Sequence, residues 1–233
     1  TIKDSAFYDC DKLATITLPD NLLRIGKSAF ASCDSITSVN IPDSVTLIGE
    51  GAFSGEKLRA FYGKYASSDN KLIVFDKTVI CAALGELTEY SIPNTVERIG
   101  FSAFGGYRNI KKFTIPNSVV SIGDGSFNSC TSLQDITIPD SVTEIVGGSF
   151  YNCTSLTSAI LSKNLTNIGD ATFMNCASLK TVFCNAVTPP QCGKGLFDGV
   201  PSGFKIYVPA ASVSAYKSAT NWSEYADSIF ADP

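Results

Sequence analysis

The sequence predicts a solenoid, a fold in which the chain winds in stacked coils of nearly equal length. Phenylalanine recurs along the 233 residues, and every step but one in this series is 23 residues long. The series comprises Phe7, Phe30, Phe53, Phe104, Phe127, Phe150 and Phe173. A fixed period of about 20–29 residues is typical of stacked coils, because each unit buries its apolar face only against the next. The period therefore argues against most enzyme architectures.

The neighbours of each phenylalanine repeat as well, in the pattern L-x-x-I-x-I-P-x-x-V-x-x-I-G-x-x-A-F-x-x-C. The alternation within L-x-x-I-x-I predicts a strand, and the proline after it ends that strand because it cannot donate a backbone hydrogen bond. We expect the phenylalanine to fill the interior of its coil. The glycine is expected to adopt a backbone conformation that other residues resist. The glycines at this position are Gly26, Gly49, Gly100, Gly123 and Gly169.

One coil, spanning 58–86, is longer than the others. Phe53 and Phe104 are separated by 51 residues instead of 46. Two apolar segments, 72–75 and 78–81, flank Asp76-Lys77, which predicts a hairpin with a two-residue turn, although Asp-Lys is a weaker turn former than Asp-Gly. The segment 63–70 before this hairpin is expected to form an exposed loop.

The repeat continues to Pro209, so we predict a solenoid over 1–209 and a small helical cap over 210–233. Ser212 is expected to begin one short helix, and Asn221 followed by Glu224 predicts a second. The side chains expected to face inward are Val213, Tyr216, Trp222, Tyr225, Ala226 and Ile229. Such a cap would cover the apolar end of the last coil.

At the other end, Ile2 and Phe7 occupy the Ile and Phe positions of a coil whose strand half is absent. We therefore expect the natural protein to extend upstream, with any targeting signal or lipid anchor in that part.

Composition excludes two classes of partner. The net charge is −4 and 17% of residues are charged, so the chain lacks the basic footprint of a nucleic-acid-binding protein. No apolar run approaches the length needed to span a membrane. We expect neither a nucleic-acid partner nor a transmembrane segment in this chain.

The eight cysteines are predicted to be mostly buried, reduced thiols. Five of them share one position of the repeat and should form a row along the solenoid. These are Cys10, Cys33, Cys130, Cys153 and Cys176. A row of this kind does not converge on a metal ion, and the chain has no histidine, so no metal site is expected. Cys184 and Cys192 lie outside the row and are the candidate disulfide pair.

Catalysis finds little support in the sequence. Without histidine there is no ordinary Ser-His or Cys-His nucleophile. Gly193-Lys194-Gly195 lacks the spacing of a phosphate-binding loop, and the carboxylates scatter over many coils. We expect no catalytic residues and no cofactor.

The fifth position of the strand points outward and changes character along the chain. It is polar at Thr17, Asn40, Ser91, Thr114 and Thr137. It is apolar on the last three coils, at Ile160, Phe183 and Tyr207, and it is Tyr62 beside the insertion. An exposed apolar row would be a binding surface, whereas terminal helices folded over it would make it part of the core, and both interpretations stay open. The candidate ligand-binding residues are Ile160, Phe183, Phe204, Tyr207, Lys180, Lys205 and Tyr62.

The repeated unit, as it stands over 36–53 and 133–153, resembles the BspA-like leucine-rich repeat of bacterial cell-surface proteins. The segments 61–68 and 205–213 also resemble segments that recur in gut-bacterial members. The resemblance covers nearly the whole chain. It implies a right-handed leucine-rich repeat solenoid with a parallel sheet on its concave face, short β or irregular segments on its convex side, and a small helical cap.

The same resemblance implies an extracellular or outer-surface protein, often lipid-anchored, that adheres to host matrix proteins, other bacteria or glycans. The family carries no shared catalytic motif, so it assigns no functional residue here. We expect a monomeric interaction module that binds a protein or polysaccharide on its concave face. The alternative is a structural spacer that displays another domain, and an enzyme ranks third.

Overall fold

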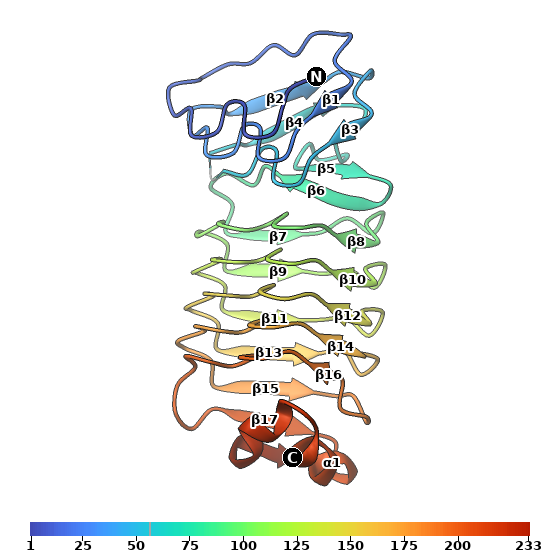
Figure 1. Ribbon diagram of the computed structural model, residues 1–233, viewed down its shortest axis with the longest axis vertical. Coiled ribbons are helices and arrows are strands. Elements are labelled where there is room, and N and C mark those ends of the chain that lie inside the picture. Colours follow the sequence, from blue (N-terminus) through green and yellow to red (C-terminus); the bar gives the residue numbers. More distant parts are fainter. Residues whose placement is uncertain (56) are drawn as a thin grey trace.

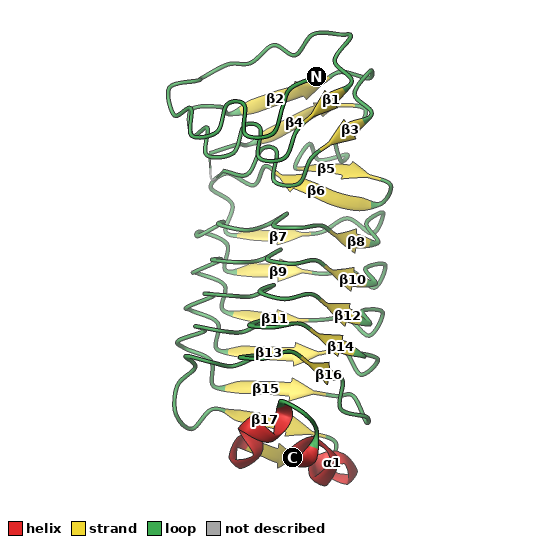
Figure 2. Ribbon diagram, viewed as in Figure 1, coloured by secondary structure: helices red, strands yellow, loops and turns green. Residues whose placement is uncertain are grey.

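The computed structural model describes residues 1–55 and 57–233, which wind into a solenoid of stacked coils (Figure 1). This part of the chain forms two seven-stranded sheets, which we call the main sheet and the side sheet, and two two-stranded sheets. From β7 to β16, each coil contributes one strand to each large sheet, and short helices occur only at the C-terminal end (Figure 2). The predicted solenoid is confirmed.

The main sheet is parallel throughout, and its strands pair in the order in which they occur. Its strands are β7 (Glu89–Ser91), β9 (Lys112–Thr114), β11 (Asp135–Thr137), β13 (Ser158–Leu161), β15 (Thr181–Cys184), β17 (Lys205–Val208) and β18 (Ile229–Ala231). Register follows the repeat, because Thr137 lies beside Ile160 and Ile160 beside Phe183. Residues at one repeat position therefore form rows across the strands.

The side sheet begins with the inserted hairpin. Its strands are β5 (Leu72–Phe75), β6 (Thr78–Ala82), β8 (Arg98–Ile99), β10 (Ser121–Ile122), β12 (Glu144–Ile145), β14 (Asn167–Ile168) and β16 (Gln191–Cys192). β5 and β6 pair antiparallel, and the two turn residues have positive φ angles, 45° at Asp76 and 60° at Lys77. Positive φ at both central residues is the signature of a type I′ turn, so the predicted hairpin is confirmed.

The hairpin separates the N-terminal coils from the rest of the solenoid. The N-terminal strands are β1 (Arg24–Ile25), β2 (Ser38–Ile41), β3 (Leu47–Ile48) and β4 (Ala60–Gly63). Leu72 and Val79 of the hairpin pack in the C-terminal core, whereas Ile73 and Cys81 pack in the N-terminal core. The hairpin thus buries both of its faces and joins two cores.

The segment before the hairpin is tied to both cores instead of forming a simple exposed loop. The Tyr65 hydroxyl donates a hydrogen bond to the Val45 carbonyl at 2.7 Å. Asp69 accepts a hydrogen bond from the Tyr90 hydroxyl at 2.9 Å. These two bonds link the segment to coils on either side of it.

The phenylalanine series forms the predicted stack inside the coils. Successive rings lie 5.0–5.7 Å apart, with their planes within 13° of parallel. Phe197 extends the series on the last coil. The stack breaks at the insertion, where Phe53 packs edge-on against Phe61 and a separate stack starts at Phe104.

The repeat glycines are required for a different reason than the sequence predicts. Of the expected five, none has a positive φ angle. A Cβ atom at Gly49 would instead lie 2.4 Å from the Lys27 nitrogen, and one at Gly169 would lie 2.3 Å from the Gly147 nitrogen. A side chain is excluded because neighbouring coils approach too closely, so the predicted unusual backbone conformation is wrong.

All eight cysteines lie in the described part of the chain and are free thiols. Four of the five in the row are buried, and each donates a hydrogen bond to the carbonyl of a phenylalanine in the preceding coil, at 3.0–3.3 Å. The four are Cys33, Cys130, Cys153 and Cys176. The thiols therefore connect coils as well as filling space. The proposed bridge between Cys184 and Cys192 is not present, because Cys184 pairs with the Tyr216 hydroxyl at 3.2 Å.

The chain after Pro209 covers the last coil. It forms η1 (Ala210–Ser212), α1 (Val213–Ser218), η2 (Trp222–Ser228) and then β18. Its side chains form hydrogen bonds with backbone groups of the last coil, which in earlier coils would bond to the next coil. The bonds join Tyr216 to the Ala186 carbonyl, Trp222 to the Pro190 carbonyl, Asn221 to the Cys192 carbonyl, and the Tyr225 hydroxyl to the Phe197 amide. These side chains cap the solenoid by replacing the hydrogen bonds of a missing coil.

Two details of the predicted cap are wrong. Ile229 belongs to β18 and not to a helix, because this segment pairs with β17 and covers the edge of the main sheet. Neither Ser212 nor Asn221 forms a side-chain helix cap. The Ser212 hydroxyl donates instead to the Val187 carbonyl at 2.6 Å, which anchors the cap to the last full coil.

Replacing one ring of the stack should destabilise the solenoid strongly. Phe127 is fully buried between Phe104 and Phe150, at 5.3 and 5.1 Å. Phe127→Ala should lower the free energy of unfolding by about 3–5 kcal/mol, because the truncation leaves a cavity between two coils. The exposed Thr137 provides the control, and Thr137→Ala should change stability by less than about 0.5 kcal/mol. Urea denaturation of both variants measures the difference, and equal midpoints would contradict the packing described.

The buried thiols should make the protein lose stability at alkaline pH. Burial raises the pKa of Cys130 and Cys176 from 9.0 to about 12. Between pH 9 and pH 12 the thiols lose their protons in the unfolded chain but keep them in the folded protein. The free energy of unfolding therefore falls as pH rises above 9, and below pH 9 these two thiols do not change it.

The matched comparison is the double variant Cys130→Ala/Cys176→Ala. Its free energy of unfolding should decline less steeply, by about 1.4 kcal/mol per pH unit for each thiol removed. Urea denaturation at several pH values between 8 and 11 measures both slopes. Identical slopes for parent and variant would show that these thiols are not buried as described.

Candidate interaction surface

The outward side of the main sheet is polar over its first three strands. Ser91 on β7, Thr114 on β9 and Thr137 on β11 occupy the fifth position of the repeat, and all three side chains are exposed. Short hydroxyl side chains at this position leave a flat, hydrogen-bonding surface. The character of the position changes at β13.

From β13 to the end of the sheet, the same position carries an apolar row. Ile160, Phe183, Tyr207 and Phe230 stand on four neighbouring strands and pair in register. Ile160 is 38% exposed and Phe230 is 42% exposed, while Phe183 and Tyr207 are half-buried. The Phe183 and Tyr207 rings stack at 5.2 Å, and the Tyr207 and Phe230 rings lie 6.5 Å apart. We call these four residues the apolar row.

The terminal helices do not bury this row. The large aromatic residues of the cap point into the end of the solenoid, where Tyr216 and Trp222 are fully buried and Trp222 packs against Phe197. The cap contributes Phe230 to the row through β18 instead of covering it. Of the two interpretations that the sequence left open, the covered row is therefore wrong.

Sequence reasoning missed Phe230, although the repeat contained the signal. Ile229, Phe230 and Ala231 follow Ile206, Tyr207 and Val208 by 23 residues, which is the period of the solenoid. The structure pairs these same residues across β17 and β18. The helical pattern of the preceding segment obscured this last, short strand.

Phe204 does not belong to the surface, which corrects the sequence-based expectation. Its side chain is 8% exposed and contacts the rings of Phe197 and Tyr225, at 5.2 and 6.3 Å. Gly203 stands where earlier coils carry leucine and has no side chain, so Phe204 fills the core at this level. It is removed from the candidate site.

The two candidate lysines lie beside the apolar row, whereas Tyr62 does not. The Lys205 amide donates to the Lys180 carbonyl at 2.9 Å, so the two lysines stand on adjacent coils. Both side chains are exposed, and the Lys205 ammonium lies 5.5 Å from the centre of the Phe230 ring. Tyr62 is 47% exposed but stands on β4, beside Asn40, in a different sheet.

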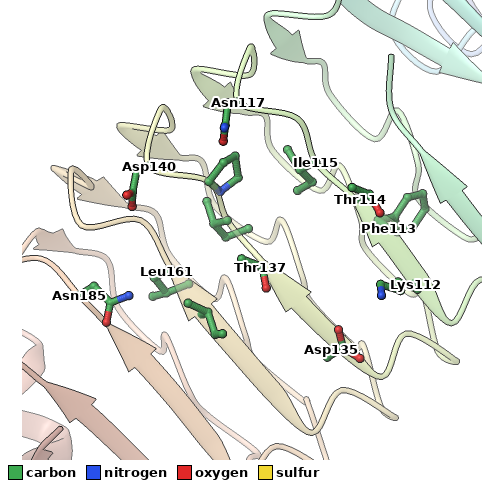
Figure 3. Close-up of a pocket in the computed structure, with 13 residues that line it drawn as sticks. Lys112, Phe113, Thr114, Ile115, Asn117, Asp135, Thr137, Asp140, Leu161 and Asn185 are labelled. Carbon is green, nitrogen blue, oxygen red and sulfur yellow. The ribbon is translucent and has the colours of Figure 1, made fainter. Parts of the chain in front are cut away.

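An open pocket of about 500 Å³ adjoins the apolar row on the same face. Figure 3 shows its lining, with Lys112 and Thr114 on one strand and Asp135 and Thr137 on the next. Three polar turn residues beyond the strand ends also line it, namely Asn117, Asp140 and Asn185, beside apolar side chains such as Ile115 and Leu161. Ile160 lines this pocket and also begins the apolar row, so the two regions are continuous. The sequence analysis did not identify this pocket.

The charges around the pocket are balanced. Register places Lys112 between Glu89 and Asp135 on the neighbouring strands. Asp140 forms an ion pair with Lys163 at 2.9 Å, and this cation lowers the pKa of the Asp140 carboxyl. Both partners are exposed, so water weakens the pair. The arrangement is suited to hydrogen bonding with a ligand.

The repeat sequence of the family described as "BspA type Leucine rich repeat region" matches residues 1–71 and 80–199 in six copies. The chain belongs to this family. The unmatched stretch between these ranges, 72–79, lies within the inserted hairpin. The BspA-like resemblance and the leucine-rich repeat fold inferred from the sequence are thereby confirmed. Solenoids of this class are typically not enzymes.

Three solved structures have a similar fold. The leucine-rich repeat protein of T. pallidum is 27% identical, with a TM-score of 0.52 over 82% of this chain and 77% of its own. A leucine-rich cell-surface protein of Faecalibacterium prausnitzii is 26% identical, with a TM-score of 0.55 over 77% of this chain and 62% of its own. The pneumococcal vaccine antigen PcpA is 19% identical, with a TM-score of 0.68 over 91% of this chain and 60% of its own, and shows the fold alone.

No curated protein sequence matches the chain at a significant level. Within residues 1–55 and 57–233, none of the helices is both long enough and apolar enough to cross a bilayer.

Proposed function

We propose that the chain is a cell-surface or secreted interaction module that binds a protein partner through the apolar row and the adjoining pocket. The observation that carries this proposal is the exposed apolar row on four successive strands, at a position that is polar on the preceding coils. A contiguous exposed apolar patch on a soluble protein is typical of a binding surface. Aromatic residues are also enriched where interfaces concentrate their binding energy.

The side chains of the row pack against one another, which supports a role in binding. Phe183 lies in register between Ile160 on β13 and Tyr207 on β17, and its ring stacks on that of Tyr207. A rigid side chain loses little conformational entropy when it is covered. Polar side chains in the pocket beside the row would supply the hydrogen bonds that fix the orientation of a partner.

A polysaccharide is the second candidate ligand, and a specific observation favours it. Aromatic faces and hydrogen-bonding amides or carboxylates together suit sugar rings, and here Tyr207 and Phe183 share a face with Asn117, Asp140 and Asn185. A spacer that only displays another domain would need no such surface. Binding of a ligand by the isolated chain would therefore favour an interaction module over a structural spacer.

We propose that the protein acts outside the cell or at its outer surface, held there by a lipid anchor. The cell-surface description of the F. prausnitzii relative supports this location, although the chain spans only 62% of that protein. We further propose that the module is monomeric and not an enzyme. In support of a monomer, β18 and the short helices cover the C-terminal end of the main sheet, where β17 would otherwise be an exposed edge.

Replacing the central aromatic residues should abolish binding while preserving the fold. The double variant Phe183→Ser/Tyr207→Thr introduces residue types that Ser91 and Thr114 already provide at this position. Retention on an array of extracellular matrix proteins and glycans should fall at least about tenfold, as expected when interface anchors are removed. The melting temperature should change by no more than about 5 °C, because both side chains are partly exposed.

Val120→Thr/Val146→Ser is the matched control, since it removes exposed apolar side chains that lie outside the main sheet. This control should bind like the parent. Undiminished retention by a folded Phe183→Ser/Tyr207→Thr protein would refute the proposed site and direct attention to Tyr62.

A further inference from the structure

We infer that the partner segment covering the apolar row is an acidic polypeptide, with carboxylates on one side of its apolar anchors. This inference rests on the proposed function and specifies the partner. It follows from Lys180 and Lys205, which border the row on the side where the strands begin. Lys180 immediately precedes β15 and Lys205 is the first residue of β17.

The position of Lys205 places its charge at the row itself. Its ammonium group lies 5.5 Å from the centre of the exposed Phe230 ring, and its backbone is bonded to that of Lys180 on the adjacent coil. The Lys205 ammonium therefore approaches any partner that covers Tyr207 and Phe230, and Lys180 lies on the neighbouring coil. Covering the row also displaces water from the ammonium groups, which strengthens their attraction to a carboxylate.

Neither lysine is compensated within the described residues. Four other lysines in the described part of the chain form ion pairs, among them Lys27 with Glu50 at 3.1 Å and Lys163 with Asp140 at 2.9 Å. No ion pair within 4.0 Å joins Lys180 or Lys205 to a carboxylate in the part of the chain that the structure describes.

The strand position of Lys205 also lacks acidic neighbours. At this position Lys112 lies between Glu89 and Asp135, so positive and negative charges alternate over the first strands. The next two strands carry neutral residues there, Ser158 and Thr181, before Lys205. A protein with a net charge of −4 thus presents a positive site beside the apolar row. Complementary charge across an interface selects partners and raises the association rate.

A polypeptide fits this combination better than a sulfated glycan. The row extends over four strands and includes the aliphatic Ile160, so its coverage requires several apolar side chains in succession. A peptide supplies apolar anchors and carboxylates on one chain. A sulfated sugar supplies the negative charge but few apolar groups.

Selection from a random library of 12-residue displayed peptides tests this inference with the chain as it stands. Clones selected on the parent should combine leucine or aromatic residues with aspartate or glutamate. Their affinity should fall about three- to tenfold on Lys180→Glu/Lys205→Glu, since two exposed charge pairs are lost, and should also fall as salt is raised. Lys3→Glu/Lys12→Glu changes the net charge equally at the N-terminal end of the solenoid and should leave the affinity unchanged.

Each outcome separates the charge inference from the proposed site. If the selected peptides bind Lys180→Glu/Lys205→Glu as they bind the parent but fail to bind Phe183→Ser/Tyr207→Thr, the apolar row is a binding site and the inference of an acidic partner is wrong. If the clones survive both double variants, the proposed site itself fails. A selected pool with no more acidic residues than the starting library would overturn the inference, as would a sulfated heparin oligosaccharide that binds more tightly than the best acidic peptide.

Discussion

The stacking of one coil on the next is the constraint on which the rest of this structure depends. Successive phenylalanine rings lie 5.0–5.7 Å apart inside the coils, close to the separation of neighbouring strands. No coil can bury its apolar side chains alone, so each must follow nearly the same path as its neighbour. Residues at equivalent positions then form continuous rows across the strands. When several successive coils carry apolar residues at one outward position, these residues form a surface that crosses several strands.

The structure changes wherever this stacking stops. At the insertion, the hairpin replaces a regular contact by packing Leu72 and Val79 on one side and Ile73 and Cys81 on the other. At the C-terminal end, hydroxyl, indole and amide groups of the cap bond to the last coil, because its backbone groups have no following coil. In both places a coil lacks a regular neighbour to stack on. The hairpin replaces that neighbour with apolar side chains on both of its faces, and the cap replaces it with polar side chains that bond to the backbone of the last coil.

The proposed binding surface is a consequence of this regularity. An apolar row is costly on a solvated sheet, yet it lies in register on β13, β15, β17 and β18. The inward positions of the same strands are already filled by buried residues such as Val182 and Ile206. Stacking of Phe183 on Tyr207 at 5.2 Å contributes to the sheet, while Ile160 and Phe230 stay exposed at its surface, which fits the proposed recognition of an apolar partner.

The sequence by itself determined the repeated architecture, since the 23-residue period, the phenylalanine stack, the hairpin turn and the buried thiols all follow from local patterns. It also determined three members of the apolar row, because the repeat pattern aligns Ile160, Phe183 and Tyr207 even though the last coil has 24 residues. Only the tertiary structure decided that Phe230 completes the row and that Phe204 turns inward. Phe204 turns inward because Gly203 leaves space that Phe204 fills against Phe197 and Tyr225. Phe230 joins the row because the chain after Pro209 folds back so that β18 pairs with β17, and the 23-residue spacing alone does not specify that return.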